Sequence, residues 1–137
     1  MYKRKEVIGD CTLYLGDCLE VMPNIELADH VICDPPYEKE AHIGNRRTKE
    51  NGRAVQNALT FDSINEDTRD GFVFEVSRLC CGWFIAFCQA EGIAPYRDVI
   101  EKYGMKYKKP MIWVKPDELP QLNGQGPGMG WESLVVS

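Results

Sequence analysis

The sequence predicts an α/β fold, because short apolar runs typical of strands alternate with segments that have helical periodicity. Residues 83–88 are apolar on both faces, as expected of a central parallel strand. Residues 63–81 begin with a capping box and carry apolar side chains at helical spacing. The chain has 137 residues, enough for one domain with a single core. We therefore expect a sheet whose parallel strands are joined by right-handed crossovers.

The first predicted elements are a strand, a turn and a short helix. The strand covers residues 12–15, and Asp17 is a suitable N-cap for a helix over 18–22. Pro23 ends that helix, because a proline cannot continue it. The next strand covers residues 30–33, and its apolar run predicts that it is buried.

Two helices are expected in the second half of the chain. The first has Ser63 as its cap and ends near residue 81. Its predicted apolar stripe consists of Ile64, Phe72, Val76, Leu79 and Cys80. The second has Pro95 in its first turn and Gly104 just past its end, which is the usual asymmetry of helix termini. Its predicted buried face consists of Tyr96, Val99, Ile100 and Tyr103.

The last predicted strands cover residues 111–114 and 133–136, and a segment rich in glycine and proline separates them. The glycines of this segment, residues 116–130, do not have the spacing of a dinucleotide-binding loop, and no Lys-Ser or Lys-Thr pair follows them. The segment also precedes a strand, whereas both phosphate-binding motifs follow one. We interpret it as a flexible loop near the ligand-binding edge of the sheet, with DNA contact as a weaker alternative.

Residues 30–37 read His-Val-Ile-Cys-Asp-Pro-Pro-Tyr. The two prolines cannot continue a sheet ladder, so the chain leaves the sheet at Asp34, at the edge where α/β sheets bind ligands. Asp34 and the carbonyl of Pro35 can each accept a hydrogen bond from an exocyclic amine. The ring of Tyr37 offers a face for stacking, worth roughly 1–3 kcal/mol per base. The pattern predicts recognition of an amino group on a flat ring, with its lone pair turned towards an electrophile.

The Asp-Pro-Pro-Tyr sequence at 34–37 resembles the signature of the amino-methylating DNA methyltransferases. Residues 13–22 resemble the strand, Gly-Asp turn and helix that precede the catalytic strand in this family, and residues 82–88 and 112–117 resemble its later strands. Residues 126–132 are similar to phage-encoded adenine methyltransferases. The resemblance covers nearly the whole chain. It implies a partial Rossmann-like, S-adenosylmethionine-dependent methyltransferase sheet that contains the catalytic half only.

The resemblance also implies an activity and the residues that perform it. A phage-type enzyme would transfer a methyl group from S-adenosylmethionine to the amino group of adenine in double-stranded DNA, with the target base flipped out of the duplex. Asp34 and Pro35 would hold the amine, Pro36 would fix the turn, and Tyr37 would stack on the base. Catalysis would come mostly from positioning. The residues implied in cofactor binding are Asp17, Cys18 and Asp34.

The family binds S-adenosylmethionine with a Phe-x-Gly-x-Gly turn, and no phenylalanine of this sequence begins that pattern. In members whose Asp-Pro-Pro-Tyr motif lies near the N-terminus, as here, the cofactor segment lies near the C-terminus. We therefore expect a C-terminally truncated methyltransferase that is inactive alone and that self-associates or needs a complementing chain. The missing strands would lie between the strand at 12–15 and the strand at 30–33, which either pair directly or leave an open edge.

The formal net charge of −5 argues against bulk electrostatic binding to nucleic acid. The distribution of charge is a better guide to a nucleic-acid contact than the total. Residues 38–60 are polar and aperiodic, and we expect a flexible loop that faces DNA and orders on binding. The phosphate contacts are expected from its basic residues Lys39, Arg46, Arg47 and Arg53. The alternative is a solvated surface loop. A second basic group is interpreted as ordinary surface and consists of Lys106, Lys108 and Lys109.

Three alternative functions fit parts of the pattern. Methylation of the cytosine amino group uses the same geometry, but that subfamily more often has serine in place of Asp34. Methylation of protein glutamine uses a related motif that begins with asparagine, and Asp34 argues against it. A non-catalytic remnant that binds DNA or a partner chain is an alternative of another class.

We expect no signal peptide, because no apolar segment follows the charged first residues. Its longest apolar run is shorter than a membrane span, so we expect a cytoplasmic protein, in the host cytoplasm if it is phage-encoded. The six cysteines form no Cys-x-x-Cys pair. We therefore expect free, mostly buried thiols and no metal site.

Overall fold

The computed structural model describes residues 2–38, 48–50, 53–55, 62–116 and 130–137, with the backbone alone at 48–50 and 53–55. Its centre is a four-stranded sheet with the strand order β3-β6-β8-β7. Strand β3 (Val31–Cys33) is parallel to β6 (Phe84–Cys88), whereas β8 (Trp131–Val136) is antiparallel to both β6 and β7 (Lys109–Val114). The alternation of strands and helices predicted from the sequence is confirmed.

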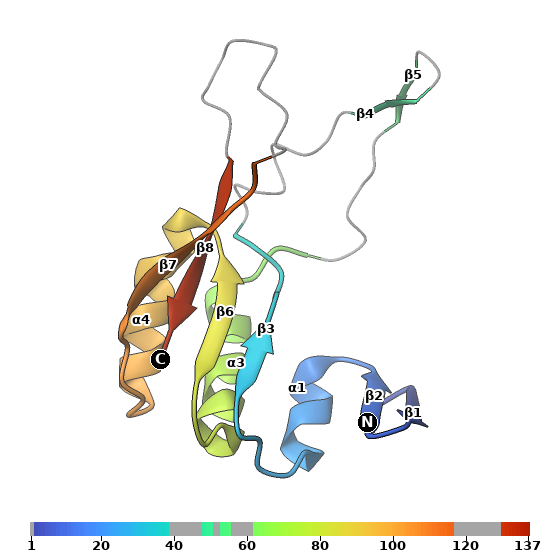
Figure 1. Ribbon diagram of the computed structural model, residues 1–137, viewed down its shortest axis with the longest axis vertical. Coiled ribbons are helices and arrows are strands. Elements are labelled where there is room, and N and C mark those ends of the chain that lie inside the picture. The colour runs from blue at the N-terminus through green and yellow to red at the C-terminus, as the bar shows by residue number, and fades with distance from the viewer. Residues whose placement is uncertain (1, 39–47, 51–52, 56–61, 117–129) are drawn as a thin grey trace.

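Two helices lie together on one face of this sheet (Figure 1). Helix α3 (Glu66–Leu79) connects β3 to β6, and α4 (Ile93–Lys102) follows β6 after a 3-10 turn, η2 (Ala90–Gly92). The core lies between the helices and the sheet. Its buried members are Met22, Ile64, Phe72, Val73, Val76, Leu79, Phe84, Ala86, Cys88, Tyr96, Ile100 and Val135. Burial of these side chains is the main force that holds the helices against the sheet.

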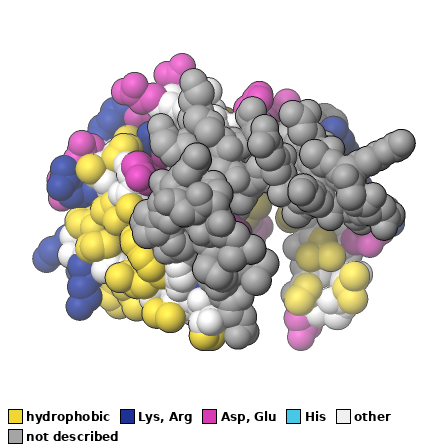
Figure 2. Space-filling view, turned by 90° about the horizontal axis from the view of Figure 1, so that it is seen from above, with side chains coloured by type: hydrophobic (Ala, Val, Ile, Leu, Met, Phe, Trp, Pro, Cys, Tyr) yellow, Lys and Arg dark blue, Asp and Glu magenta, His cyan; other side chains and the backbone are white. Residues whose placement is uncertain are grey.

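The opposite face of the sheet is largely open to solvent among the described residues. Phe84, Ala86 and Cys88 point into the core, whereas the alternate positions of β6 are only half-buried. Phe87 contacts the ring of Trp113 edge to face, with the centroids 6.2 Å apart. The exposed apolar side chains of β7 are Met111, Ile112, Trp113 and Val114. In the view from above, hydrophobic side chains gather at the left of the molecule (Figure 2).

The prediction that strand 30–33 is buried is wrong for one of its faces. Ile32 is 70% exposed, because β3 lies at the edge of the sheet and the helices cover only the face occupied by Val31 and Cys33. Strand β3 has one described neighbour, β6. An apolar residue in a strand is buried only if another element covers its face.

The N-terminal residues form a separate hairpin (Figure 1). Strands β1 (Arg4–Ile8) and β2 (Cys11–Leu15) pair with each other and not with β3. Neither arrangement predicted for the first strand and β3 is found in full: the first strand, β2, pairs with β1, and only β3 has an edge without a described partner. Helix α1 (Cys18–Val21) follows and continues into a 3-10 turn, η1 (Met22–Asn24). The sequence prediction missed β1, whose polar and apolar residues give no clear strand pattern.

Within the segment predicted as an aperiodic loop, the structure describes a short antiparallel hairpin. It consists of β4 (Thr48–Glu50) and β5 (Arg53–Val55). Most of residues 38–60 lie outside the described residues, as do residues 117–129 of the glycine-rich segment.

A side-chain cap marks the start of α3, and a glycine in the left-handed conformation marks the end of α4. The cap of α3 is Asn65 and not Ser63, because the Asn65 side chain accepts the backbone N–H of Thr68 at 2.8 Å. The N–H of Ile64 is bonded to the carbonyl of Tyr37, so residues 63–64 belong to the preceding loop. Gly104 follows α4 with a φ of 75°, the left-handed conformation that favours glycine, so the prediction for this end is confirmed.

No helix among the described residues is long and apolar enough to cross a membrane. The prediction of mostly buried thiols is wrong for Cys11, Cys18 and Cys81, which are exposed, whereas Cys88 is buried and the other two are half-buried. All six are free. In the part of the chain that is described, no group of three potential ligands could hold a metal ion.

Candidate active site

The turn at 34–37 follows β3 directly, at the end of the sheet where β3, β6 and β7 end and β8 begins (Figure 1). Asp34 and Pro36 are exposed, and Pro35 and Tyr37 are half-buried. The four residues predicted to recognise a base therefore lie together at the edge of the sheet, with the Asp34 carboxylate open to a ligand. Parallel strands present their ligand-binding residues at this edge.

Tyr37 is held through its backbone. Its carbonyl accepts a hydrogen bond from the N–H of Ile64, with N and O 3.0 Å apart. The side chain of Ile64 is buried in the core, so this bond ties the turn to the base of α3.

The hydroxyl of Tyr37 lies between two carboxylates. Burial and interactions with Asp34 and Glu132 raise the pKa of this hydroxyl far above its usual value, so it stays protonated. It has one hydrogen, which it can donate to either carboxylate.

Glu132 and Lys115 are residues of this edge that the sequence prediction missed. Lys115 follows β7 and forms an ion pair with Glu132 on β8. Its backbone N–H also donates to the carbonyl of Gly130 at 2.7 Å. The pairing of Val114 with Trp131 brings these residues together. No single-sequence signal marks Glu132, because its role depends on the antiparallel register of two strands.

Glu38 was predicted as the first residue of a flexible loop that faces DNA, and this prediction is wrong for Glu38 itself. Its side chain is buried and forms an ion pair with the buried Arg69 of α3. The cation of Arg69 and the backbone N–H of Gln89, both distant in the sequence, replace the water that a buried carboxylate would lose.

The two predicted cofactor residues at the start of α1 are exposed. One oxygen of Asp17 caps the helix by accepting the N–H of Leu19 at 2.9 Å, which confirms the predicted cap. Burial raises the pKa of Cys33 to about 12, with smaller effects from Asp34 and Cys18.

The predicted DNA contacts cannot be placed as side chains. Lys39, Arg46 and Arg47 lie outside the described residues, and Arg53 begins β5 with only its backbone described.

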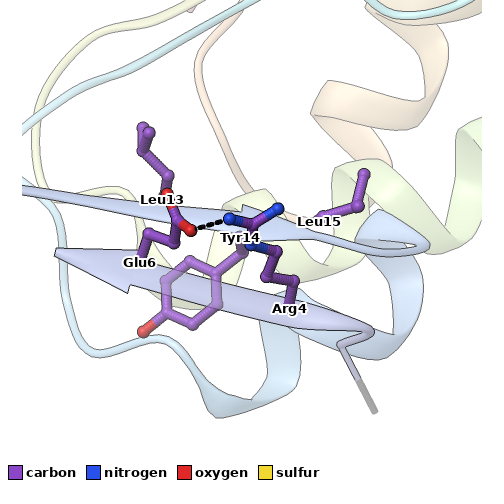
Figure 3. A pocket seen from close by; sticks show the side chains of 5 residues that line it. All are labelled: Arg4, Glu6, Leu13, Tyr14 and Leu15. Atoms are coloured by element: carbon purple, nitrogen blue, oxygen red, sulfur yellow. Dashed lines mark hydrogen bonds and ion pairs between the residues drawn. The ribbon is translucent and has the colours of Figure 1, made fainter.

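A shallow hollow lies on the N-terminal hairpin and not at the turn (Figure 3). It is lined by Arg4, Glu6, Leu13, Tyr14 and Leu15. Arg4 and Glu6, both on β1, form an ion pair there, and their side chains are exposed. None of the turn residues takes part, so we assign this hollow no role in the site.

Neither a family model nor a curated protein matches the sequence. Solved structures do match. The complex of M1.HpyAVI with SAM superposes with a TM-score of 0.61 at 16% identity, over 88% of this chain and 52% of that chain. The structure of M1.HpyAVI alone gives 0.60 at 20% identity, over 88% and 51%. The chain has a partial S-adenosylmethionine-dependent methyltransferase fold.

A third structure agrees with this fold. TTHA0409 of Thermus thermophilus, described as a DNA modification methylase, superposes with a TM-score of 0.54 at 21% identity, over 88% of this chain and 49% of that chain. The chain thus spans about half the length of each of these structures. The fold class predicted from the sequence, a partial sheet of this kind, is confirmed.

Proposed function

We propose that this chain is the catalytic half of a DNA methyltransferase that transfers a methyl group from S-adenosylmethionine to the amino group of adenine. The observation that carries the proposal is the exposed Asp34 carboxylate on an Asp-Pro-Pro-Tyr turn, at the ligand edge of a methyltransferase fold. A carboxylate and a proline carbonyl supply acceptors without a competing donor. This set suits an amine that has two protons to give.

In the proposed mechanism the turn orients a flipped adenine. Asp34 and the Pro35 carbonyl accept the two amino hydrogens, so the nitrogen lone pair points away from the turn. Pro36 fixes the backbone between them, and the Tyr37 ring stacks on the base. The amine is thus held for an in-line attack, and most of the acceleration comes from this orientation.

Two carboxylates of the chain, those of Asp17 and Asp34, also suit the cofactor as hydrogen-bond acceptors. S-adenosylmethionine supplies an electrophilic methyl group when it is bound. Asp17 keeps one carboxylate oxygen free beyond its helix cap, and carboxylates suit the ammonium and ribose hydroxyl groups of that molecule. We propose Asp17, Cys18 and Asp34 as the residues that bind it.

We further propose that the strands with the cofactor-binding Phe-x-Gly-x-Gly turn come from another segment, in cis or in trans. Strand β3 has one described neighbour and pairs with no strand of the N-terminal hairpin. The chain also spans about half of the similar structures. The complete protein would be of phage type, act in the cytoplasm and bind double-stranded DNA.

The experiment that tests this function uses the chain joined to the part of M1.HpyAVI that has no counterpart in it. Isothermal titration of S-adenosylmethionine into this fusion should show saturable binding, and Asp34→Ala should weaken it. A remnant that only binds DNA would show no binding of the cofactor by the fusion, which would contradict the proposal.

Substitutions at Tyr37 test its stacking role. Tyr37→Ala should weaken capture of the flipped base by roughly 1–3 kcal/mol, the stacking energy of one base. Tyr37→Phe should be milder, because the ring face remains and only the contacts of the hydroxyl with Asp34 and Glu132 are lost. Binding to DNA with 2-aminopurine in place of adenines measures the capture. Equal damage from Phe and Ala would show that the hydroxyl matters more than the ring.

Charge reversal of Arg46, Arg47 and Arg53 tests the predicted phosphate contacts. Binding should weaken for all DNA sequences, and the dependence of affinity on salt should become flatter, because fewer counterions are released. Fluorescence anisotropy at several salt concentrations measures both. The matched control reverses three exposed lysines, Lys106, Lys108 and Lys109, and should leave the salt dependence almost unchanged. If the salt dependence of affinity were unchanged in the arginine variant, these residues would not contact phosphate and their segment would be an ordinary surface loop.

A further inference from the structure

A buried ion pair lies directly behind the turn. Glu38 follows Tyr37 in the chain, and its side chain is only 10% exposed, while that of its partner Arg69 is 9% exposed. Glu38 Oε1 accepts a hydrogen bond from Arg69 Nη2 at 3.2 Å. Glu38 Oε2 accepts the backbone N–H of Gln89 at 3.3 Å. One side chain thus connects the turn to α3 and to the end of β6.

The surroundings of this pair are shaped to fit it. A Cβ atom added to Gly92, at the start of α4, would lie 2.2 Å from Glu38 Oε1, so a side chain at this position would displace the carboxylate from where it lies. On the other side, the guanidinium carbon of Arg69 lies 5.3 Å from the centroid of the Tyr96 ring, a cation–π contact. Tyr96 is itself buried on α4. Residues of the start of α4 and of α4 itself therefore surround both charged groups.

A buried ion pair is a weak source of stability, because desolvation of the two charges offsets most of their attraction. Apolar residues of similar size would fill this space equally well. What the ion pair supplies is a fixed position for the backbone at Glu38. This residue directly follows Tyr37, whose ring is the candidate for stacking on the base. The N–H of Ile64 also donates a hydrogen bond to the carbonyl of Tyr37.

We propose that Glu38 and Arg69 are positioning residues for base capture, which hold the Asp34–Tyr37 turn in its ligand-ready conformation from beneath. This inference rests on the proposed function. Prolines 35 and 36 restrict the turn from within, and the ion pair anchors its far end to α3 and the end of β6. Asp34, the first acceptor proposed for the base amine, stays exposed, whereas Pro35 and Tyr37 are half-buried. Neither Glu38 nor Arg69 touches the base in this account.

The test uses Glu38→Gln in the full chain, which keeps the shape of the side chain and removes its charge. Asp98→Asn is the matched control, because Asp98 is an exposed carboxylate paired with Arg97 on α4. With 3-fluorotyrosine incorporated, the Tyr37 fluorine resonance is assigned from Tyr37→Phe. In Glu38→Gln this resonance should shift and broaden, and exchange of the Ile64 amide hydrogen should accelerate at least about tenfold. The control should leave both unchanged.

A second variant keeps the test decisive if Glu38→Gln folds poorly. Arg69→Lys retains the cation, and it should fold and show smaller changes of the same kind at Tyr37 and Ile64. A positioning role also predicts that adenosine, titrated by NMR, binds at least about fivefold more weakly to Glu38→Gln than to Asp98→Asn. A Tyr37 resonance and an Ile64 exchange rate equal to those of the control would overturn the inference.

The two proposals fail in different ways. If neither the unaltered chain nor the control binds adenosine while Tyr37 still responds to Glu38→Gln, base capture is wrong and the anchoring of the turn stands. If adenosine binds all variants equally while Tyr37 responds, the anchoring does not serve base capture and the inference is overturned.

Discussion

Asp34→Ala is expected to abolish methyl transfer while it leaves the fold largely intact. Asp34 is exposed at the end of β3 and belongs to none of the core positions, so its loss removes no packing. It would remove the acceptor that orients the substrate amine, and removal of one preorganised polar group costs roughly 10²–10³-fold in rate. With the cofactor also affected, the loss should exceed this range. Transfer of tritiated methyl groups to DNA by the completed enzyme measures it.

The control for Asp34→Ala is Asp98→Ala, which removes an exposed carboxylate from α4, a helix outside the proposed site. The two variants should melt within a few degrees of the unaltered protein, since neither residue is buried. Only Asp34→Ala should lose activity. Near-normal turnover by purified Asp34→Ala would show that the turn is not the catalytic element.

The second large effect concerns residues 1–137 without a complementing segment. We expect this chain to be marginally stable or self-associating and to transfer no methyl groups. The edge of β3 that faces away from β6 is paired with no described strand, and edges of this kind recruit other chains. Each buried backbone group left without a partner costs about 1–3 kcal/mol. The exposed apolar side chains of β7 add to the tendency to associate.

Light scattering and thermal melting compare the chain alone with the fusion that carries the missing segment. The fusion should be monomeric, melt cooperatively at a higher temperature and bind S-adenosylmethionine. Ile32→Lys, at an exposed position of β3, should reduce self-association of the chain alone without completing the sheet. A monomeric, cooperatively melting 137-residue protein that binds the cofactor tightly would contradict the proposal that a half is missing.

The sequence predicted most of the elements because their signals are local. The pattern of Pro95 and Gly104 located α4, and the two prolines after Asp34 located the end of β3. The cap of α3 was misplaced by two residues because Ser63 and Asn65 both suit the position. The contact between the Ile64 N–H and the Tyr37 carbonyl, which joins distant parts of the chain, keeps residue 63 outside the helix.

Burial and the support of the site could not be predicted in the same way. The exposure of Ile32 depends on which elements cover β3, and an apolar run carries no information on that. The partners of Glu38 and Tyr37 come from α3 and β8, far along the chain, so their charges look like ordinary surface residues in the sequence. The turn itself was found because its four residues are contiguous.

The most direct test of the central claim is the identity of the methylated base. Unmethylated DNA is incubated with the fusion and S-adenosylmethionine, digested to nucleosides and measured by mass spectrometry. The account predicts N6-methyladenine from the unaltered fusion, and none from a fusion that carries Asp34→Ala. Methylcytosine in place of N6-methyladenine, or no methylated base from a fusion that binds the cofactor, would contradict it.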